Sequence, residues 1–530
     1  MSRAPMSADL TPLRKTLTEL LPLLEAKSDW YASIYFERKS SKTFSANLKQ
    51  TQLSDQISTG AVLRIYDGYT LFEQATDELE EKKLQALAKS FAERVLATQP
   101  SAGAIHRPYR AISWSERLSV PLELEITSQI PKSASAKTEV HFGIGFNQDP
   151  KKPVTSETLE RLKSIVARVQ TLAPQAGLTA QEVSYVLARQ GFTEEESIFI
   201  DRETNMSQTL YRIMLMVITM SGADRTFTRL GGLGGLESIE VSDEDLLELL
   251  RNLKALKSAA RLHPGKYKVL IGPALTGVLA HEAFGHSQEA DTCARGRSKA
   301  WELHQNETIV GNQHATILNN PAIFENAASA GAKEPRTYAA WGSYFFDEEG
   351  WLAQEQVLLD QGKLKAPMTN LTSALRLGIP RTANGKRESW ANGVYTRQTN
   401  TYFSAGDKTL DDLMDELEDG FVAMYPAGGM EDPKGMGIQV GISFLEEVKN
   451  GKRTGRVFRG PAGGDIQLTG YTPDILNSIL AKSKIEFNSK SPDQYKHPFN
   501  DVGGCGKYHK EIVHAGCGGP FVLLDQVTLG

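Results

Sequence analysis

The 530-residue chain contains only three cysteines, at positions 293, 505 and 517. Three thiols cannot form an even disulfide framework in a chain of this length, so we expect a reducing, cytoplasmic compartment. Each cysteine is then either a metal ligand or a buried thiol. The first residues also lack an apolar segment behind their charges, and we therefore expect no secretory signal there.

Long apolar runs and an excess of basic charge are also missing. The longest apolar run covers residues 213–220, far below the roughly 20 residues of a bilayer-spanning helix. Acidic residues number 64 and basic residues 59, which gives a formal net charge of −5. A protein built around nucleic acid normally shows a basic field. We therefore expect neither a membrane protein nor a nucleic-acid-binding protein.

The residue pattern predicts an α+β fold with two domains. Leucines recur at helical spacing over residues 13–24, and strand-like segments follow, with a hairpin signal at Asp67-Gly68. Beyond residue 264, short strands alternate with Gly, Pro and Asn turns. We predict an N-terminal helix and antiparallel-sheet domain over 1–240 and a strand-rich C-terminal domain over 241–530. Separate strands are expected at 30–38, 43–50, 61–66, 183–189, 197–202 and 208–221.

One segment carries the residue types of a metal centre. His281, Glu282 and His286 form the pattern H-E-x-x-x-H. Five residues on a regular α-helix rotate the second imidazole about 140° away from the first, which is too far for both to bind one ion. A π-bulge would bring the rings together, and Gly285 would ease that distortion. We therefore predict that the helix widens or ends between the two histidines.

The chemistry of zinc suits these side chains. Neutral imidazole nitrogens bind Zn²⁺, and a neighbouring glutamate can accept a proton from a metal-bound water. A catalytic zinc site has three protein ligands, so one ligand is missing from this segment. The alternative is a buried helix in which His281 bonds a backbone carbonyl and Glu282 pairs with Arg295. The candidates for a third ligand are Cys505, Cys517, Cys293, Glu289 and Asp291.

Several motifs together resemble the TldD/TldE (PmbA) family of zinc metallopeptidases. The resemblance covers most of the chain and is sharpest over residues 264–530. The motifs that carry it are GVLAHEAFGHSQEAD (277–291), Asp347-Glu348-Glu349-Gly350, Arg397–Tyr402, Gly504-Cys505-Gly506-Lys507 and the closing Asp525–Gly530.

This resemblance implies a set of roles. His281, His286 and Cys505 would bind zinc, with Glu282 as the general base. The substrates would be unfolded or extended peptides that add a strand to a sheet edge, with leader-peptide processing as a biological setting. The resemblance also implies a dimer, either of identical chains or with a TldE-like subunit that lacks the H-E-x-x-x-H pattern.

The same resemblance leaves some questions open. Glu289 and Asp291 match acidic positions of the family and could orient a zinc-bound imidazole, or they could form salt bridges with Arg295 and Arg297. Residues 508–520 depart from the family pattern, and they add His509, His514 and Cys517, either as incidental residues or as further ligands. Two rival functions remain: a non-catalytic scaffold subunit of a heterodimer, and a different metal-dependent hydrolase.

Overall fold

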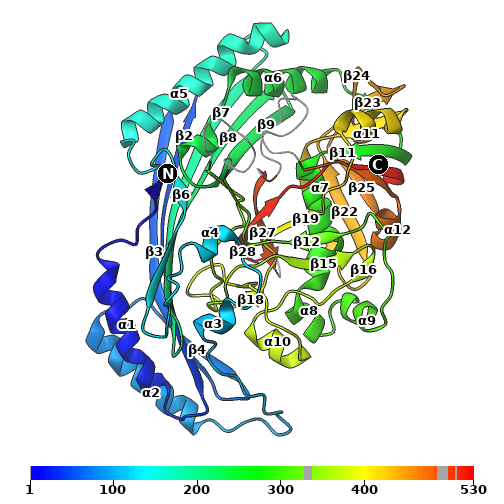
Figure 1. The fold of residues 1–530 in the computed structure, drawn as a ribbon. Helices are drawn as coiled ribbons and strands as arrows, with labels where there is room; N and C mark the ends of the chain where they lie inside the picture. The colour runs from blue at the N-terminus through cyan, green and yellow to red at the C-terminus, as the bar shows by residue number, and fades with distance from the viewer. Residues whose placement is uncertain (1, 327–336, 486–498, 500, 508–509) are drawn as a thin grey trace.

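The structure is a computed structural model, and it describes residues 2–326, 337–485, 499, 501–507 and 510–530. Figure 1 shows a large curved sheet, coloured blue to green, beside a strand-rich half that runs from green to red. The predicted two-domain α+β fold is confirmed. None of the helices within these residues is long and apolar enough to cross a membrane.

The first sheet contains nine of the described strands. β5 (Glu139–Gly143) lies beside β8, off the main path. In order across the sheet, the other strands are β13 (Phe324–Asn326), β14 (Thr337–Ala339), β9 (Asp224–Leu233), β8 (Asn205–Ser221), β7 (Tyr185–Asp201), β2 (Tyr31–Asn47), β3 (Thr51–Tyr66) and β4 (Leu71–Thr76). Two of these strands, β13 and β14, come from beyond residue 240, and the domain boundary at that residue stays a prediction.

The prediction of short separate strands at the start of this sheet was wrong. The segments 30–38 and 43–50 are one strand, β2, and the segments 183–189 and 197–202 are one strand, β7. The polar residues between the predicted segments remain in strand because opposite charges face each other across the two strands, Arg38 opposite Glu196 and Lys39 opposite Glu195. Such cross-strand pairs stabilise a sheet.

Four long helices pack against this sheet, with α1, α2 and α5 on its outer side and α6 at the top in Figure 1. Their leucines and valines pack on the apolar residues of the central strands. The helical spacing of leucines over residues 13–24 predicted the first of these helices, because an amphipathic helix places one apolar face on the sheet. They are α1 (Leu10–Leu24), α2 (Glu81–Ala97), α5 (Thr155–Leu172) and α6 (Asp243–Lys257).

The second sheet forms the core of the C-terminal half. Its central strand β11 (Gly265–Ile271) ends in three buried apolar residues, and β26 (Ile479–Lys482) lies beside β29. In order across the sheet, the path is β10 (Ala260–Arg261), β24 (Lys452–Arg459), β23 (Leu445–Lys449), β20 (Gly420–Ala423), β11, β29 (Val522–Leu529), β25 (Ile466–Tyr471), β22 (Gly437–Ile442) and β21 (Pro426–Asp432).

A third sheet joins the middle of the chain to its C-terminal part. Strand β19 pairs in parallel with β28, and β28 pairs with β27. The order is β16 (Lys363–Leu364), β15 (Gln356–Asp360), β12 (Ile317–Asn319), β19 (Asn400–Phe403), β28 (Lys510–Cys517) and β27 (Asp501–Lys507).

Short elements complete the described residues. The paired two-residue strands are β1 (Ser2–Arg3) with β6 (Gly145–Phe146) and β17 (Gly385–Lys386) with β18 (Tyr395–Thr396). The short helices are α3 (Trp114–Arg117), α4 (Leu124–Thr127), α7 (Pro273–Ala280), α8 (Ala290–Ala294), α9 (Ala300–Gln305), α10 (Leu371–Leu377), α11 (Leu410–Leu417) and α12 (Thr472–Asn477).

Candidate metal centre

Helix α7 carries the chain into the candidate site. It begins at Pro273, where the missing N–H of proline costs nothing because the first turn has no internal acceptor for it. All eight of its residues are buried, since it packs against β19 and β28 on one side and β21 and β22 on the other. A helix that is enclosed in this way can hold its last residues in a fixed orientation.

The helix widens directly after α7. Residues His281–Gly285 form a single π-helical turn, and the N–H of His286 donates to the carbonyl oxygen of His281, five residues earlier. The two imidazole rings consequently lie with their centres 4.8 Å apart and their planes at 89°. The predicted widening between the two histidines is confirmed.

Gly285 allows this turn because of a close neighbour. A Cβ atom at this position would lie 2.0 Å from Oε1 of Gln398. The Gln398 side chain also donates from Nε2 to the carbonyl oxygen of His281, at 3.3 Å. Gln398 therefore supports the π turn, and only glycine leaves room for it.

Strand β27 brings a cysteine to these rings from more than 200 residues away. The Sγ atom of Cys505 lies 3.3 Å from Nε2 of His286, and the side chain is buried. The ligand atoms of His281, His286 and Cys505 all lie within 4.8 Å of one another. The structure therefore brings this sulfur and the two imidazole rings together.

The spacing of these atoms suits a tetrahedral metal ion. With Zn–N and Zn–S bond lengths of about 2.0 and 2.3 Å, the nitrogen–sulfur edge of a tetrahedron is about 3.5 Å. The Nδ1 atom of His281 is buried without a hydrogen-bond partner among the described residues, and the same ring interacts with Cys505. Burial alone would raise the pKa of Cys505, but His286 and His281 hold it well below its usual range. The three side chains therefore fit a metal ion.

The other two cysteines lie elsewhere. The Cys293 thiol is buried and donates to the carbonyl oxygen of Ser287 at 3.4 Å, and burial raises its pKa to about 12. The backbone of Cys517 packs against α7, since a Cβ on Gly277 would lie 2.9 Å from the Cys517 Cα. Neither residue belongs to the group of metal-binding side chains found among the described residues.

Glu282 lies beside a second carboxylate that the sequence did not indicate. Oxygen atoms of Glu282 and Glu431 and a ring nitrogen of His286 lie within 4.8 Å of one another. Strand β21 carries Glu431 across Glu282, and a Cβ on Gly429 would lie 2.6 Å from the Glu282 Cγ. Burial and the neighbouring Glu282, partly opposed by His286, raise the pKa of Glu431 to about 7. The sequence around Glu431 does not distinguish it from an acidic residue that is exposed to solvent, because it lies in a Gly-rich segment without a motif.

Glu289 and Asp291 lie behind His286. Oε1 of Glu289 is 3.5 Å from Nδ1 of His286. The Lys507 ammonium donates to Oε2 of Glu289 at 2.8 Å and to Oδ1 of Asp291 at 2.6 Å. The Arg397 side chain donates to the carbonyl oxygen of Cys505. Glu289 is therefore in the position of a carboxylate that orients a ligand imidazole, whereas Asp291 pairs with a lysine.

His514, one of the two histidines that depart from the family pattern, lies against the first sheet. Nε2 of His514 lies 3.0 Å from Oε1 of Glu195 on β7, and its ring packs edge-on against Trp341. This histidine therefore binds the first sheet, on the face of the β27–β28 hairpin away from Cys505. His509 lies outside the described residues.

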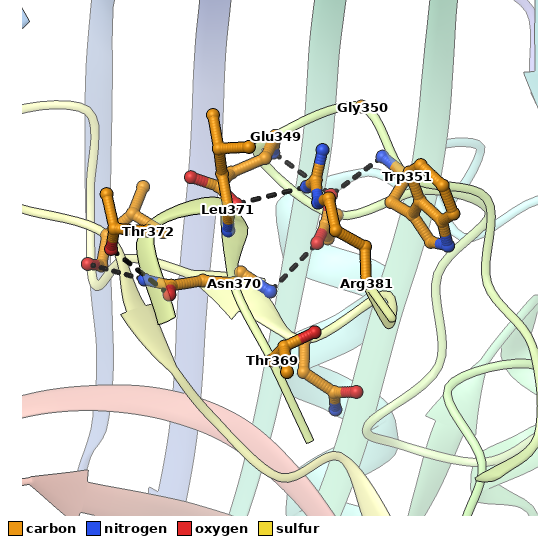
Figure 2. Close-up of polar contacts among 12 residues, drawn as sticks. Glu349, Gly350, Trp351, Thr369, Asn370, Leu371, Thr372 and Arg381 are labelled. Carbon is orange, nitrogen blue, oxygen red and sulfur yellow. Dashed lines mark hydrogen bonds and ion pairs between the residues drawn. The ribbon is translucent and has the colours of Figure 1, made fainter. Parts of the chain in front are cut away.

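The acidic motif Asp347-Glu348-Glu349-Gly350 forms a connection between the two halves of the chain. Figure 2 shows Glu349 between Leu371 and Arg381. Glu349 accepts from Arg64 of β3 at 2.5 Å, from Arg381 at 3.1 Å and from the Leu371 N–H at 2.5 Å. This carboxylate is fully buried and fully paired, so it serves the architecture and is not a metal ligand.

Comparison with protein families supports a hydrolase with a metal. The family model described as the PmbA/TldA metallopeptidase C-terminal domain matches residues 264–530. A metalloprotease of Methanothermobacter thermautotrophicus is 26% identical over 416 residues, which cover 76% of this chain and 82% of the relative. A zinc metalloprotease TldD homologue of Saccharolobus solfataricus is 24% identical over 378 residues, or 71% of this chain and 76% of the relative.

A solved structure shares the fold. TldE from Thermococcus kodakarensis superposes with a TM-score of 0.62 at 13% sequence identity, over 98% of this chain and 100% of the other. At this identity the likeness concerns the fold alone.

Proposed function

Because this chain belongs to the PmbA/TldD metallopeptidase family, we propose that it is a zinc-dependent metallopeptidase that hydrolyses unfolded or extended peptides in the cytoplasm. The observation that carries this proposal is the meeting of His281, His286 and Cys505 within 4.8 Å. The name of the Saccharolobus relative supports zinc as the metal.

In this proposal His281, His286 and Cys505 would hold the zinc ion. Zinc bound there supplies a Lewis acid that polarises the scissile carbonyl and lowers the pKa of the attacking water. Glu282 accepts a proton from that water and delivers it to the leaving amine. Its Oε2 atom is buried and has no hydrogen-bond partner among the described residues, so it is available for this proton.

The substrate would bind as an added strand along β21. Within the described strands, β21 pairs with β22 alone, at the end of the second sheet. Its residues 427–430 are exposed, and Gly429 lies directly over Glu282. Backbone hydrogen bonds along a sheet edge recognise an extended chain with little dependence on its side chains. We therefore propose broad cleavage of unfolded peptides, with leader-peptide removal as one setting.

The test is cleavage of a reduced, unfolded polypeptide by the zinc-loaded protein, with the fragments identified by mass spectrometry. Glu282→Gln should lower kcat by about 10²- to 10⁴-fold, the usual contribution of a general base, without loss of bound zinc. Glu302→Gln, in an exposed ion pair with Lys299, is the matched control and should leave the rate unchanged. Cleavage that persists at the wild-type rate in Glu282→Gln would contradict the proposal.

The second candidate is a non-catalytic subunit of a TldD/TldE-type heterodimer, which is favoured by the shared fold with TldE. If the protein is instead the catalytic subunit, it could form either a homodimer or a heterodimer with a TldE-like chain. A protein that binds no zinc and cleaves no peptide after zinc addition would support the scaffold function. Zinc binding together with Glu282-dependent cleavage would exclude it.

A further inference from the structure

Two residues of strand β27, Cys505 and Lys507, contact the histidine segment. A β-bulge separates Cys505 from Lys507, and both side chains contact the segment that begins at His281. Cys505 meets His286 directly at 3.3 Å. Lys507 meets the residues that follow His286, Glu289 at 2.8 Å and Asp291 at 2.6 Å.

The lysine is matched to its surroundings. An ammonium group has three N–H donors, and the third donates to the carbonyl oxygen of Thr396 at 3.0 Å. The side chains of Lys507, Glu289 and Asp291 are only 5%, 2% and 9% exposed. A buried cation between two carboxylates fixes all three side chains, because removing one partner leaves buried charge without compensation.

The cluster reaches the candidate metal ligands through Glu289. One carboxylate oxygen of Glu289 accepts from Lys507, and the other lies 3.5 Å from Nδ1 of His286. A carboxylate at the far nitrogen of a ligand imidazole sets the orientation of the ring. Two connections therefore run side by side from β27 to the histidine segment, one through the Cys505 sulfur and one through Lys507 and Glu289.

We propose that Lys507 is a positioning residue that sets the separation of the Cys505 sulfur and the His286 ring at the distance that a metal ion requires. This inference rests on the proposed function, since it takes both side chains as ligands. The contact between Lys507 and Glu289 matters because the two ligands belong to different elements. Cys505 lies on a strand of the third sheet, and His286 follows the π turn after α7. Arg397 also joins the two elements, since it donates to the carbonyl oxygen of Cys505 and its Nε atom lies 3.9 Å from Oε1 of Glu289. Lys507 adds direct contacts with both Glu289 and Asp291.

The experiment measures Co²⁺ and Zn²⁺ binding to the full-length protein. Binding of Co²⁺ through Cys505 produces a sulfur-to-cobalt charge-transfer absorption, and chelator competition measures the affinity for Zn²⁺. We expect Lys507→Met to bind zinc about 10- to 100-fold more weakly, the usual effect of losing an outer partner of a metal ligand, and to reduce the charge-transfer absorption. Lys507→Arg should restore part of both.

Lys449→Met removes a lysine from an exposed ion pair with Asp419 and is the matched control, with no expected change. If Lys507→Met does not fold, as judged by circular dichroism without metal, Asp291→Asn replaces it and should weaken zinc binding by about 10-fold. The positioning role of Lys507 would be wrong if folded Lys507→Met, or Asp291→Asn in its place, showed the wild-type zinc affinity and cobalt spectrum. This result would leave the proposed function standing. Absence of the charge-transfer absorption in the wild-type protein would instead overturn the proposed function.

Discussion

Two buried carboxylates of this protein, Glu282 and Glu349, have opposite hydrogen-bonding environments. Both oxygens of Glu349 accept hydrogen bonds, from Arg64, Arg381 and the Leu371 N–H. Glu282 keeps one buried oxygen without a partner among the described residues and lies beside a second carboxylate, Glu431. A buried polar group without a partner is costly. The difference indicates that the Glu349 cluster stabilises the fold, whereas the unpaired oxygen of Glu282 is consistent with the general-base role proposed above.

The largest expected effect concerns the paired cluster. Glu349→Gln keeps the size of the side chain but leaves Arg64 and Arg381 with uncompensated buried charge. The free energy of unfolding should fall by about 3–5 kcal/mol, as measured by chemical denaturation. Glu116→Gln, in an exposed pair with Arg110, should change stability little. A Glu349→Gln protein as stable as the wild type would show that the pairing at Glu349 is not what holds the two halves of the chain together.

The second effect concerns metal affinity. Cys505→Ser removes the sulfur that contacts His286, and zinc affinity should fall by more than about 100-fold, the upper end for outer partners of a ligand. Isothermal titration or chelator competition measures this change. Cys293→Ser is the control, because that thiol donates to the backbone carbonyl of Ser287 and lies outside the cluster of His281, His286 and Cys505. Equal losses in both variants would contradict the assignment of Cys505.

The third effect is a pH dependence that originates at Glu431. Its pKa of about 7 is well above that of a glutamate in an unfolded chain, so between about pH 4.5 and 7 the folded protein binds more protons than the unfolded one. The stability that Glu431 contributes is thus present at low pH and is lost as the pH rises through this window.

The metal-free Glu431→Gln variant should not show this loss. The difference in free energy of unfolding between this variant and the wild type should shift by about 2–3 kcal/mol in favour of the variant as the pH rises from 4.5 to 8. Denaturation curves at several pH values measure the gain. A constant difference between the two proteins across the range would show that Glu431 titrates normally.

The smallest effect concerns the π turn. Gly285→Ala places a methyl group against the Gln398 side chain and should lower the free energy of unfolding by about 1–3 kcal/mol. Gly464→Ala is the control, since a Cβ there meets nothing within 4 Å. Thermal denaturation of the two variants makes the comparison. Equal melting temperatures would mean that Gln398 moves away at no cost.

Short sequence patterns predicted local structure where neighbouring residues decide it, and they failed where distant residues decide it. The five-residue spacing of His281 and His286 predicted the π turn because helical geometry depends only on neighbouring residues. The strand predictions failed at residues 39–42, where the polar sequence indicated a break. There the deciding contacts were with charged residues of β7, about 150 positions away.

Resemblance, and not residue spacing, selected Cys505 from the candidates for the third ligand. Spacing left Cys293, Cys517, Glu289 and Asp291 as alternatives, because a side chain 219 positions from His286 has no local signal of its proximity. Glu431 was missed for the same reason. Lys507 belongs to the Gly504–Lys507 motif, but its contacts with Glu289 and Asp291 are what indicate its role.

The spacing of leucines in the first helix and the widened turn between the two histidines follow from residues that are close together in the chain, and several short motifs were enough to indicate the family. The folding of the whole chain settles which thiol meets the imidazoles, which carboxylate lies beside Glu282 and which cation lies behind His286. These contacts join strands of separate sheets, and their distances follow from how the sheets pack around α7.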